Sequence, residues 1–108
     1  MKITYQDEDV EALCKQSKIA TKRLGKESAI KLKRRMAELY AATVVAELVI
    51  GRPHPLARDR AGQFAVDLHR AKRLIFKPSG IPPLKADGTI DWSSVTDITI
   101  IEAGDYHD

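Results

Sequence analysis

The spacing of the apolar residues changes once along the chain, and this change constrains the fold more than any other feature. Up to about Gly51, apolar side chains recur at intervals of three and four residues, as in Val10, Leu13 and Cys14. Beyond Gly51 they alternate with other side chains, as from Phe64 to Leu68. A period near 3.6 is typical of a helix that buries one side, and a period of two is typical of a half-buried strand. The sequence therefore predicts helices in its first half and strands in its second.

The first half is predicted to contain a short strand followed by helices. Residues 2–5 alternate polar and apolar side chains and predict the strand. A first helix is expected from about Glu8 to Gly25, since glycine commonly ends helices. A second is expected from about Glu27 to Tyr40, and Thr43 is expected to cap a short third helix that reaches Leu48. The second helix is predicted to turn these residues toward a core: Ile30, Leu32, Met36, Leu39 and Tyr40.

The second half is predicted to form three strands. Two of them, Phe64 to Leu68 and Leu74 to Phe76, are close enough in sequence to form an antiparallel hairpin. The last strand is expected from about Val95 to Ala103. Helices and strands segregated along the chain predict an α+β fold, with the helices on one face of a small antiparallel sheet. Arg73 alternates with Leu74 and Phe76, so we expect it on the more open face, where a cation is well placed to hold a phosphate.

The length and composition are those of one folded domain. The 108 residues suffice for a single core, so we expect one domain that spans residues 1–108. The one cysteine, Cys14, excludes an intramolecular disulfide. No apolar run approaches the ~20 residues of a membrane span, and the N-terminus has no secretory apolar segment. We therefore expect a cytoplasmic protein that does not bind membranes.

The net charge of +3 conceals two basic stretches, at residues 15–35 and 52–77, between acidic stretches near both ends. Basic blocks in so short a chain favour a polyanionic partner, because the neutralisation of phosphates supplies most of the affinity for nucleic acids. A solvated helix face has the same composition. Charge alone therefore does not define the function.

Three short motifs are more specific than the charge. The first is His54-Pro55-Leu56, which Asp59-Arg60-Ala61-Gly62-Gln63-Phe64 follows. The second is Arg73-Leu74-Ile75-Phe76, and the third is Asp105-Tyr106-His107. In this order, and with this order of elements, the motifs resemble the HigB branch of the RelE/ParE toxin superfamily. The resemblance covers essentially the whole chain.

The resemblance implies a RelE-like toxin of a type II toxin–antitoxin pair that is an endoribonuclease, or mRNA interferase. Toxins of this branch cleave mRNA, usually on the ribosome, and a helix-turn-helix antitoxin silences them. The implied partners are mRNA, the ribosome and a cognate HigA-like antitoxin. The implied catalytic residues, matched position by position, are His54, Arg73, Asp105, Tyr106 and His107.

The sequence departs from this branch at three places. Members often have Lys-Gly where this chain has Ala57 and Arg58, so the cation is displaced by one residue. Asp108 follows the terminal histidine, and the loop from Pro78 to Asp91 is longer than in compact members. We assign that loop no catalytic role. The basic residues expected to hold flanking phosphates of the RNA are Arg58, Arg60 and Lys72.

The matched residues could supply what RNA cleavage by its own 2′-hydroxyl needs. Histidine titrates near neutral pH, so His54 and His107 are expected to share the roles of acid and base, in an order that the sequence leaves open. Arg73 is expected to clamp the phosphate through two N–H bonds. Asp105 is expected to orient a histidine or to accept the hydroxyl proton, and Tyr106 to bind phosphate or stack on a base.

We expect no metal and no cofactor, since the chain has no paired cysteines, no His-Glu-x-x-His and no glycine-rich phosphate loop. Two other functions remain open. A ParE-like toxin of the same fold would inhibit DNA gyrase without cutting RNA, although paired histidines argue against a pure binder. A non-catalytic RNA-binding module would rest on the basic helices alone.

Overall fold

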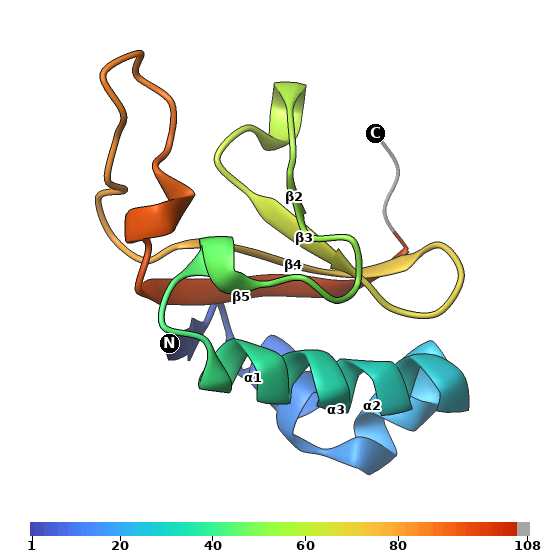
Figure 1. Cartoon of the computed structure of the whole chain (residues 1–108). Helices are drawn as coiled ribbons and strands as arrows, with labels where there is room; N and C mark the ends of the chain where they lie inside the picture. The colour runs from blue at the N-terminus through green and yellow to red at the C-terminus, as the bar shows by residue number, and fades with distance from the viewer. Residues whose placement is uncertain (106–108) are drawn as a thin grey trace.

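A computed structural model describes residues 1–105 of the chain (Figure 1). The strands are β1 (Lys2–Tyr5), β2 (His54–Pro55), β3 (Phe64–Asp67), β4 (Lys72–Pro78) and β5 (Asp97–Asp105). The α-helices are α1 (Glu8–Lys15), α2 (Ser17–Leu24) and α3 (Lys26–Ala41). Short 3₁₀ turns lie at η1 (Val45–Glu47), η2 (Arg58–Arg60) and η3 (Trp92–Ser94). No helix among these residues is both long and apolar enough to cross a membrane.

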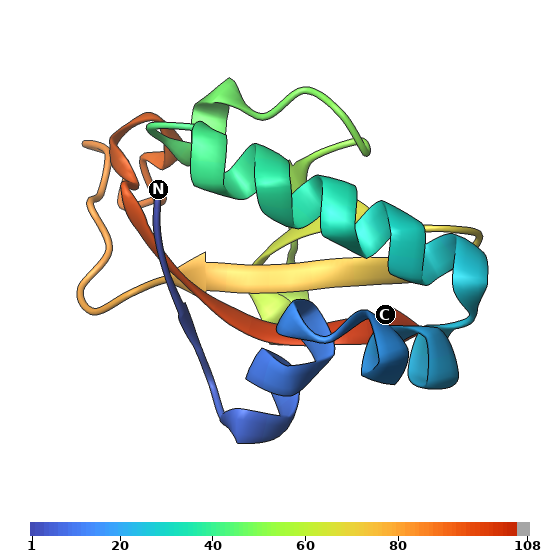
Figure 2. The same cartoon turned by 90° about the horizontal axis from the view of Figure 1, so that it is seen from below.

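The strands form one sheet in the order β1-β5-β4-β3-β2, and the helices cover one of its faces (Figures 1 and 2). The predicted α+β class is therefore confirmed. The sheet is mixed rather than purely antiparallel, because β1 pairs in parallel with β5, with Lys2 opposite Asp97. The segments that contain η2 and residues 79–91 rise above the other face (Figure 1).

The predicted first helix is two helices. The backbone of Gln16 is extended, with φ −116° and ψ 107°, and this residue separates α1 from α2. The side chain of Asp7 caps α1 by accepting a hydrogen bond from the backbone N–H of Val10 at 2.9 Å. The break lets α1 bury Leu13 while α2 turns to bury its own apolar residues, Ala20 and Leu24. The predicted third helix is only the 3₁₀ turn η1, and Thr43 does not cap it by its side chain.

The core lies between α3 and the sheet, and α3 buries a different set of residues from the predicted one. Leu32, Met36 and Leu39 are buried as expected, but Ile30 and Tyr40 are 41% and 53% exposed. Arg35 is buried instead, because it lies three residues after Leu32 and four before Leu39, on the same side of the helix. Its Nε atom lies 2.8 Å from a carboxylate oxygen of Glu38, which offsets the charge.

An irregularity in the β4–β5 pairing sets which residues of β5 face the helices. Ile75 lies opposite Glu102, whereas the next residue, Phe76, lies opposite Ile100. One residue of β5 is thus left over, which is a β-bulge. Ile100 lies in the core, and Glu102 is moved to the face away from the helices.

Candidate active site

The polar site lies on the face of the sheet opposite the helices. Two neighbouring rows of directly opposed residues define it: His54, Ala65, Ile75 and Glu102 in one, and Asp67, Arg73 and Gly104 in the other. Side chains of directly opposed residues share a face, as do residues two apart on one strand. His54 and Arg73 therefore lie on the same face. That Arg73 lies on the face away from the helices agrees with its alternation with Leu74 and Phe76.

Asp67 lies between two arginines. One carboxylate oxygen accepts a hydrogen bond from Nε of Arg73 at 3.1 Å, and the other accepts one from Nε of Arg52 at 3.0 Å. The Arg73 side chain is 23% exposed and the Arg52 side chain 65%. Two guanidinium groups from separate segments are thus held beside one carboxylate.

The ring of His54 is held by a backbone carbonyl. Its Nδ1 lies 2.7 Å from the carbonyl oxygen of Arg52. A carbonyl oxygen can only accept, so Nδ1 carries the proton, and Nε2 of the neutral ring carries the lone pair. Nε2 is therefore the atom through which His54 can take a proton from a bound molecule.

Arg60 reaches the same face from η2. Its Nη1 donates to the side-chain oxygen of Gln63 at 3.0 Å and forms an ion pair with Glu102. Arg58 begins the same turn and has a φ of +56°, which is uncommon for a residue other than glycine. Its side chain is exposed.

Lys72 and Asp105 are directly opposed at the end of the sheet, and Nζ of Lys72 lies 4.0 Å from a carboxylate oxygen of Asp105. Lys72 directly precedes Arg73, and Asp105 directly follows Gly104, the residue opposite Arg73. Because side chains alternate between the two faces along a strand, Lys72 and Asp105 point to the opposite face from Arg73. Asp105 is thus brought close to Lys72 rather than to His54. The predicted residues Tyr106 and His107 lie outside the described residues.

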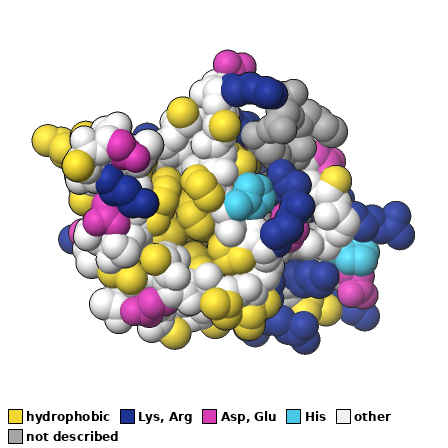
Figure 3. Space-filling view, turned by 45° about the horizontal axis from the view of Figure 1, so that its top comes forward, with side chains coloured by type: hydrophobic (Ala, Val, Ile, Leu, Met, Phe, Trp, Pro, Cys, Tyr) yellow, Lys and Arg dark blue, Asp and Glu magenta, His cyan; other side chains and the backbone are white. Residues whose placement is uncertain are grey.

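Arg52, Asp67 and Glu102 belong to this face and were not predicted. The hairpin register could have identified Asp67, since it is the cross-strand partner of Arg73. Glu102 could not have been found, because its face depends on the bulge. In space-filling view, Lys and Arg side chains gather around a histidine on this face, beside an apolar area (Figure 3).

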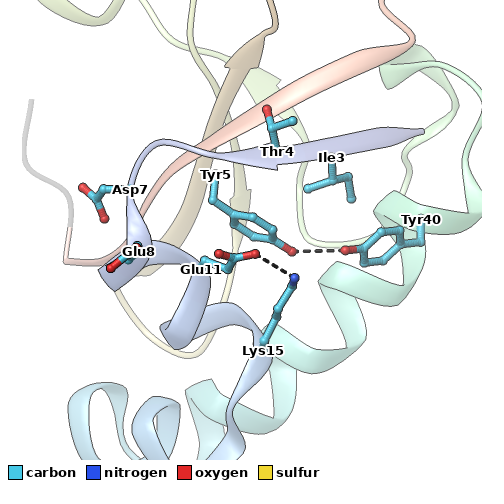
Figure 4. Close-up of a pocket in the computed structure, with 8 residues that line it drawn as sticks. All are labelled: Ile3, Thr4, Tyr5, Asp7, Glu8, Glu11, Lys15 and Tyr40. Carbon is cyan, nitrogen blue, oxygen red and sulfur yellow. Dashed lines mark hydrogen bonds and ion pairs between the residues drawn. The ribbon is translucent and has the colours of Figure 1, made fainter.

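A hollow of about 400 Å³ lies at the β1 edge of the sheet (Figure 4). The hydroxyls of Tyr5 and Tyr40 hydrogen-bond across it at 3.1 Å, and Nζ of Lys15 lies 2.7 Å from Glu11. Burial, and then the bond to Tyr40, raise the pKa of Tyr5 well above its usual value. Its other lining residues are Ile3, Thr4, Asp7 and Glu8. The excess of carboxylates makes this hollow unsuitable for a phosphate.

Within residues 1–105, no three His, Cys, Asp or Glu side chains are grouped so that they could hold a metal ion.

The fold resembles that of a solved toxin. The chain is similar in structure to a YoeB/ParE toxin from Agrobacterium tumefaciens, with a TM-score of 0.59 and 15% sequence identity over 99% of this chain and 100% of the other. Scans against protein-family models and curated proteins find no match. At this identity the similarity shows a shared fold, so the chain has the same α+β fold as this toxin.

Proposed function

We propose that this chain is the toxin of a type II toxin–antitoxin pair, of the HigB branch, and that it is an endoribonuclease that cleaves mRNA. The observation that carries the proposal is the hydrogen bond from Nδ1 of His54 to the carbonyl of Arg52, which leaves Nε2 as a base on the face that carries Arg73. The toxin fold and the sequence motifs support the same activity.

The proposed reaction is an attack by RNA on itself. Nε2 of His54 takes the proton from the 2′-hydroxyl, and the resulting oxygen attacks the neighbouring phosphorus while the P–O5′ bond breaks. Arg73 donates N–H bonds to the phosphate oxygens, whose negative charge grows in the transition state. His107 is proposed to give a proton to the departing 5′-oxygen, and Tyr106 to bind phosphate or stack on a base. The products are a 2′,3′-cyclic phosphate and a 5′-hydroxyl.

The remaining basic residues are proposed to hold the RNA strand on either side of the cut. Arg60 lies on the same face as His54 and is held there by Glu102 and Gln63. Arg58 is exposed in the same turn. Lys72 lies at the sheet end and points to the opposite face, and it is proposed to bind RNA that extends past that end. Cations at these positions neutralise flanking phosphates without reading the base sequence.

The proposed ribosome partner follows from the openness of the site, and the proposed antitoxin from the sequence motifs. The open face of a small sheet does little to orient a flexible RNA chain. A ribosome that already holds the mRNA supplies that orientation. We therefore propose cleavage of mRNA on the ribosome. The antitoxin is proposed to be a HigA-like helix-turn-helix protein.

The test is 5′-end mapping of transcripts after induced expression. The wild type and the matched control His69→Ala, which changes a histidine of the β3–β4 turn, are expected to produce new 5′ ends. His54→Ala and His107→Ala are expected to leave transcripts intact. Transcripts that stay intact in the wild type while DNA gyrase is inhibited would establish the gyrase-binding alternative. Undiminished cleavage in both variants would refute the acid–base roles.

A further inference from the structure

Asp67 has no role in the proposed reaction, and its negative charge at this position is unfavourable for the binding of RNA. It places a carboxylate on the face that carries His54 and Arg73, where the phosphates of RNA are proposed to bind. A negative charge there repels the substrate, since like charges a few ångströms apart oppose each other strongly outside bulk water. We therefore expect Asp67 to contribute to the site in another way that offsets this repulsion.

Asp67 joins the segment before β2 to the sheet in two ways. Its backbone N–H donates to the carbonyl of Gly51 at 2.6 Å, and its side chain accepts from Nε of Arg52 at 3.0 Å. Its second carboxylate oxygen accepts from Nε of Arg73, its cross-strand partner, at 3.1 Å. One residue thus sets the positions of both guanidinium groups.

The same contacts reach His54 through the backbone of Arg52. The carbonyl of Arg52 accepts the Nδ1–H bond of His54, and Arg52 has a φ of +49°. This left-handed conformation costs an L-residue free energy, so it persists only where surrounding contacts hold it. The bond to Asp67 is one such contact.

We propose that Asp67 is a positioning residue that holds Arg52 and Arg73 side by side and, through Arg52, orients the ring of His54. Arg52 is then a second phosphate-binding residue, which binds a phosphate next to the scissile one. A guanidinium carries five N–H donors, so its Nε bond to Asp67 leaves donors for that phosphate, and the side chain is 65% exposed. This inference rests on the proposed function.

Because Asp67 is negatively charged, its replacement is expected to change RNA binding and RNA cleavage in opposite directions. Asp67→Asn keeps the shape and one acceptor oxygen but removes a negative charge from the basic face. Binding of an uncleavable RNA, with a 2′-deoxy residue at the cut, is expected to tighten about twofold to tenfold. Single-turnover cleavage of ribosome-bound mRNA is expected to slow about 10–100-fold, because the reacting groups lose their alignment. A merely structural role would weaken both.

Two further variants control for charge and for shape. Glu102→Gln removes a carboxylate from the same face, where it pairs with Arg60, and is expected to tighten binding while slowing cleavage less than Asp67→Asn does. Asp67→Glu restores the charge and is expected to recover part of the cleavage rate. Cleavage by Asp67→Asn at the wild-type rate would overturn the inference.

A measurement that does not depend on RNA cleavage tests the positioning role of Asp67 separately from the proposed function. The ¹⁵N shifts of the His54 ring report which nitrogen carries the proton, and Asp67→Asn is expected to lose the single Nδ1–H form. A wild type that cleaves no RNA would refute the proposed function. An unchanged ring spectrum in Asp67→Asn would refute the positioning role.

If Asp67→Asn fails to fold, Arg52→Ala tests the same inference. Because the Arg52 side chain is mostly exposed, its removal is expected to leave the fold intact. It is expected to weaken binding of the uncleavable RNA and to slow cleavage. Wild-type values of both would overturn the inference.

Discussion

At the scale of single residues, the orientation of Arg73 depends on the planar shape of its side chain as well as on its charge. Its Nε edge is bonded to Asp67, so the guanidinium plane is fixed relative to the sheet. A guanidinium can present two parallel N–H groups to a phosphate, whereas an ammonium acts as a point charge. The proposed clamp therefore requires arginine at this position, and not only a cation.

Arg73→Lys is expected to lower the rate of RNA cleavage about 10²–10³-fold, by analogy with the loss of one transition-state donor. The charge is kept, so KM is expected to change little. Steady-state kinetics on a defined mRNA would measure both. The control is Lys77→Arg, which changes an exposed cation of the same strand and is expected to cleave normally. Wild-type activity of the Arg73→Lys variant would exclude a bidentate clamp.

Cys14 gives a prediction for stability. Burial raises the pKa of its thiol to about 12, whereas the unfolded thiol titrates near its ordinary value. The stabilising contribution of the neutral thiol is therefore complete below the unfolded pKa and is lost as the pH rises toward 12. Between pH 8 and 10 the loss is expected to be about 1 kcal/mol, from the shift in proton binding.

Urea unfolding at both pH values would measure this loss. The Cys14→Ala variant, in which every other group titrates as in the wild type, is expected to lose about 1 kcal/mol less free energy of unfolding over the same range. Equal losses in the two proteins would show that the thiol is not buried in solution.

At the scale of elements, the hydrophobic periods predicted the order of strand, helices and strands, and also the face on which Arg73 lies. They could not predict three features that depend on tertiary contacts. Arg35 is buried because Glu38 and Gly51 lie beside it, although its charge suggests an exposed position. The break at Gln16 follows from packing, and the bulge reverses the direction of Glu102.

Gly51 connects the core to the site. A Cβ atom there would lie 2.8 Å from a terminal nitrogen of Arg35 and 3.2 Å from the backbone oxygen of Asp67, and its φ is +84°. Gly88 has a nearly equal φ of +88° with nothing within 4 Å, so it is a matched control for backbone strain alone. Comparison of the two positions isolates the effect of the close contacts.

Gly51→Ala is expected to lower the free energy of unfolding by about 1–3 kcal/mol more than Gly88→Ala does, because overpacking adds to the backbone cost. Thermal or urea unfolding of both variants would measure the difference. The Gly51 variant is also expected to cleave RNA more slowly, since Arg52 is its neighbour. Equal destabilisation of the two variants would mean that Arg35 and Asp67 move aside freely.

At the scale of the whole molecule, the helices and the site lie on opposite faces of one sheet (Figure 1). Packing against α3 makes β3 and β4 a rigid support, on which Asp67 and Arg73 are directly opposed. The face that carries the site is not covered by helices, which suits a long RNA chain rather than an enclosed small molecule. The sequence motifs predicted that His54 and Arg73 share a site, whereas the pairing of Asp105 with Lys72 depends on the register of β4 and β5.

The chemical ends of the RNA products distinguish attack by the 2′-hydroxyl of RNA from hydrolysis by water. The wild type is expected to leave a 2′,3′-cyclic phosphate and a 5′-hydroxyl on a defined, ribosome-bound mRNA. His54→Ala is expected to lower the yield of these ends about 10²–10⁴-fold, which is the usual contribution of a general base. Products that end in a 3′-hydroxyl and a 5′-phosphate, or an undiminished yield from His54→Ala, would contradict the proposed reaction.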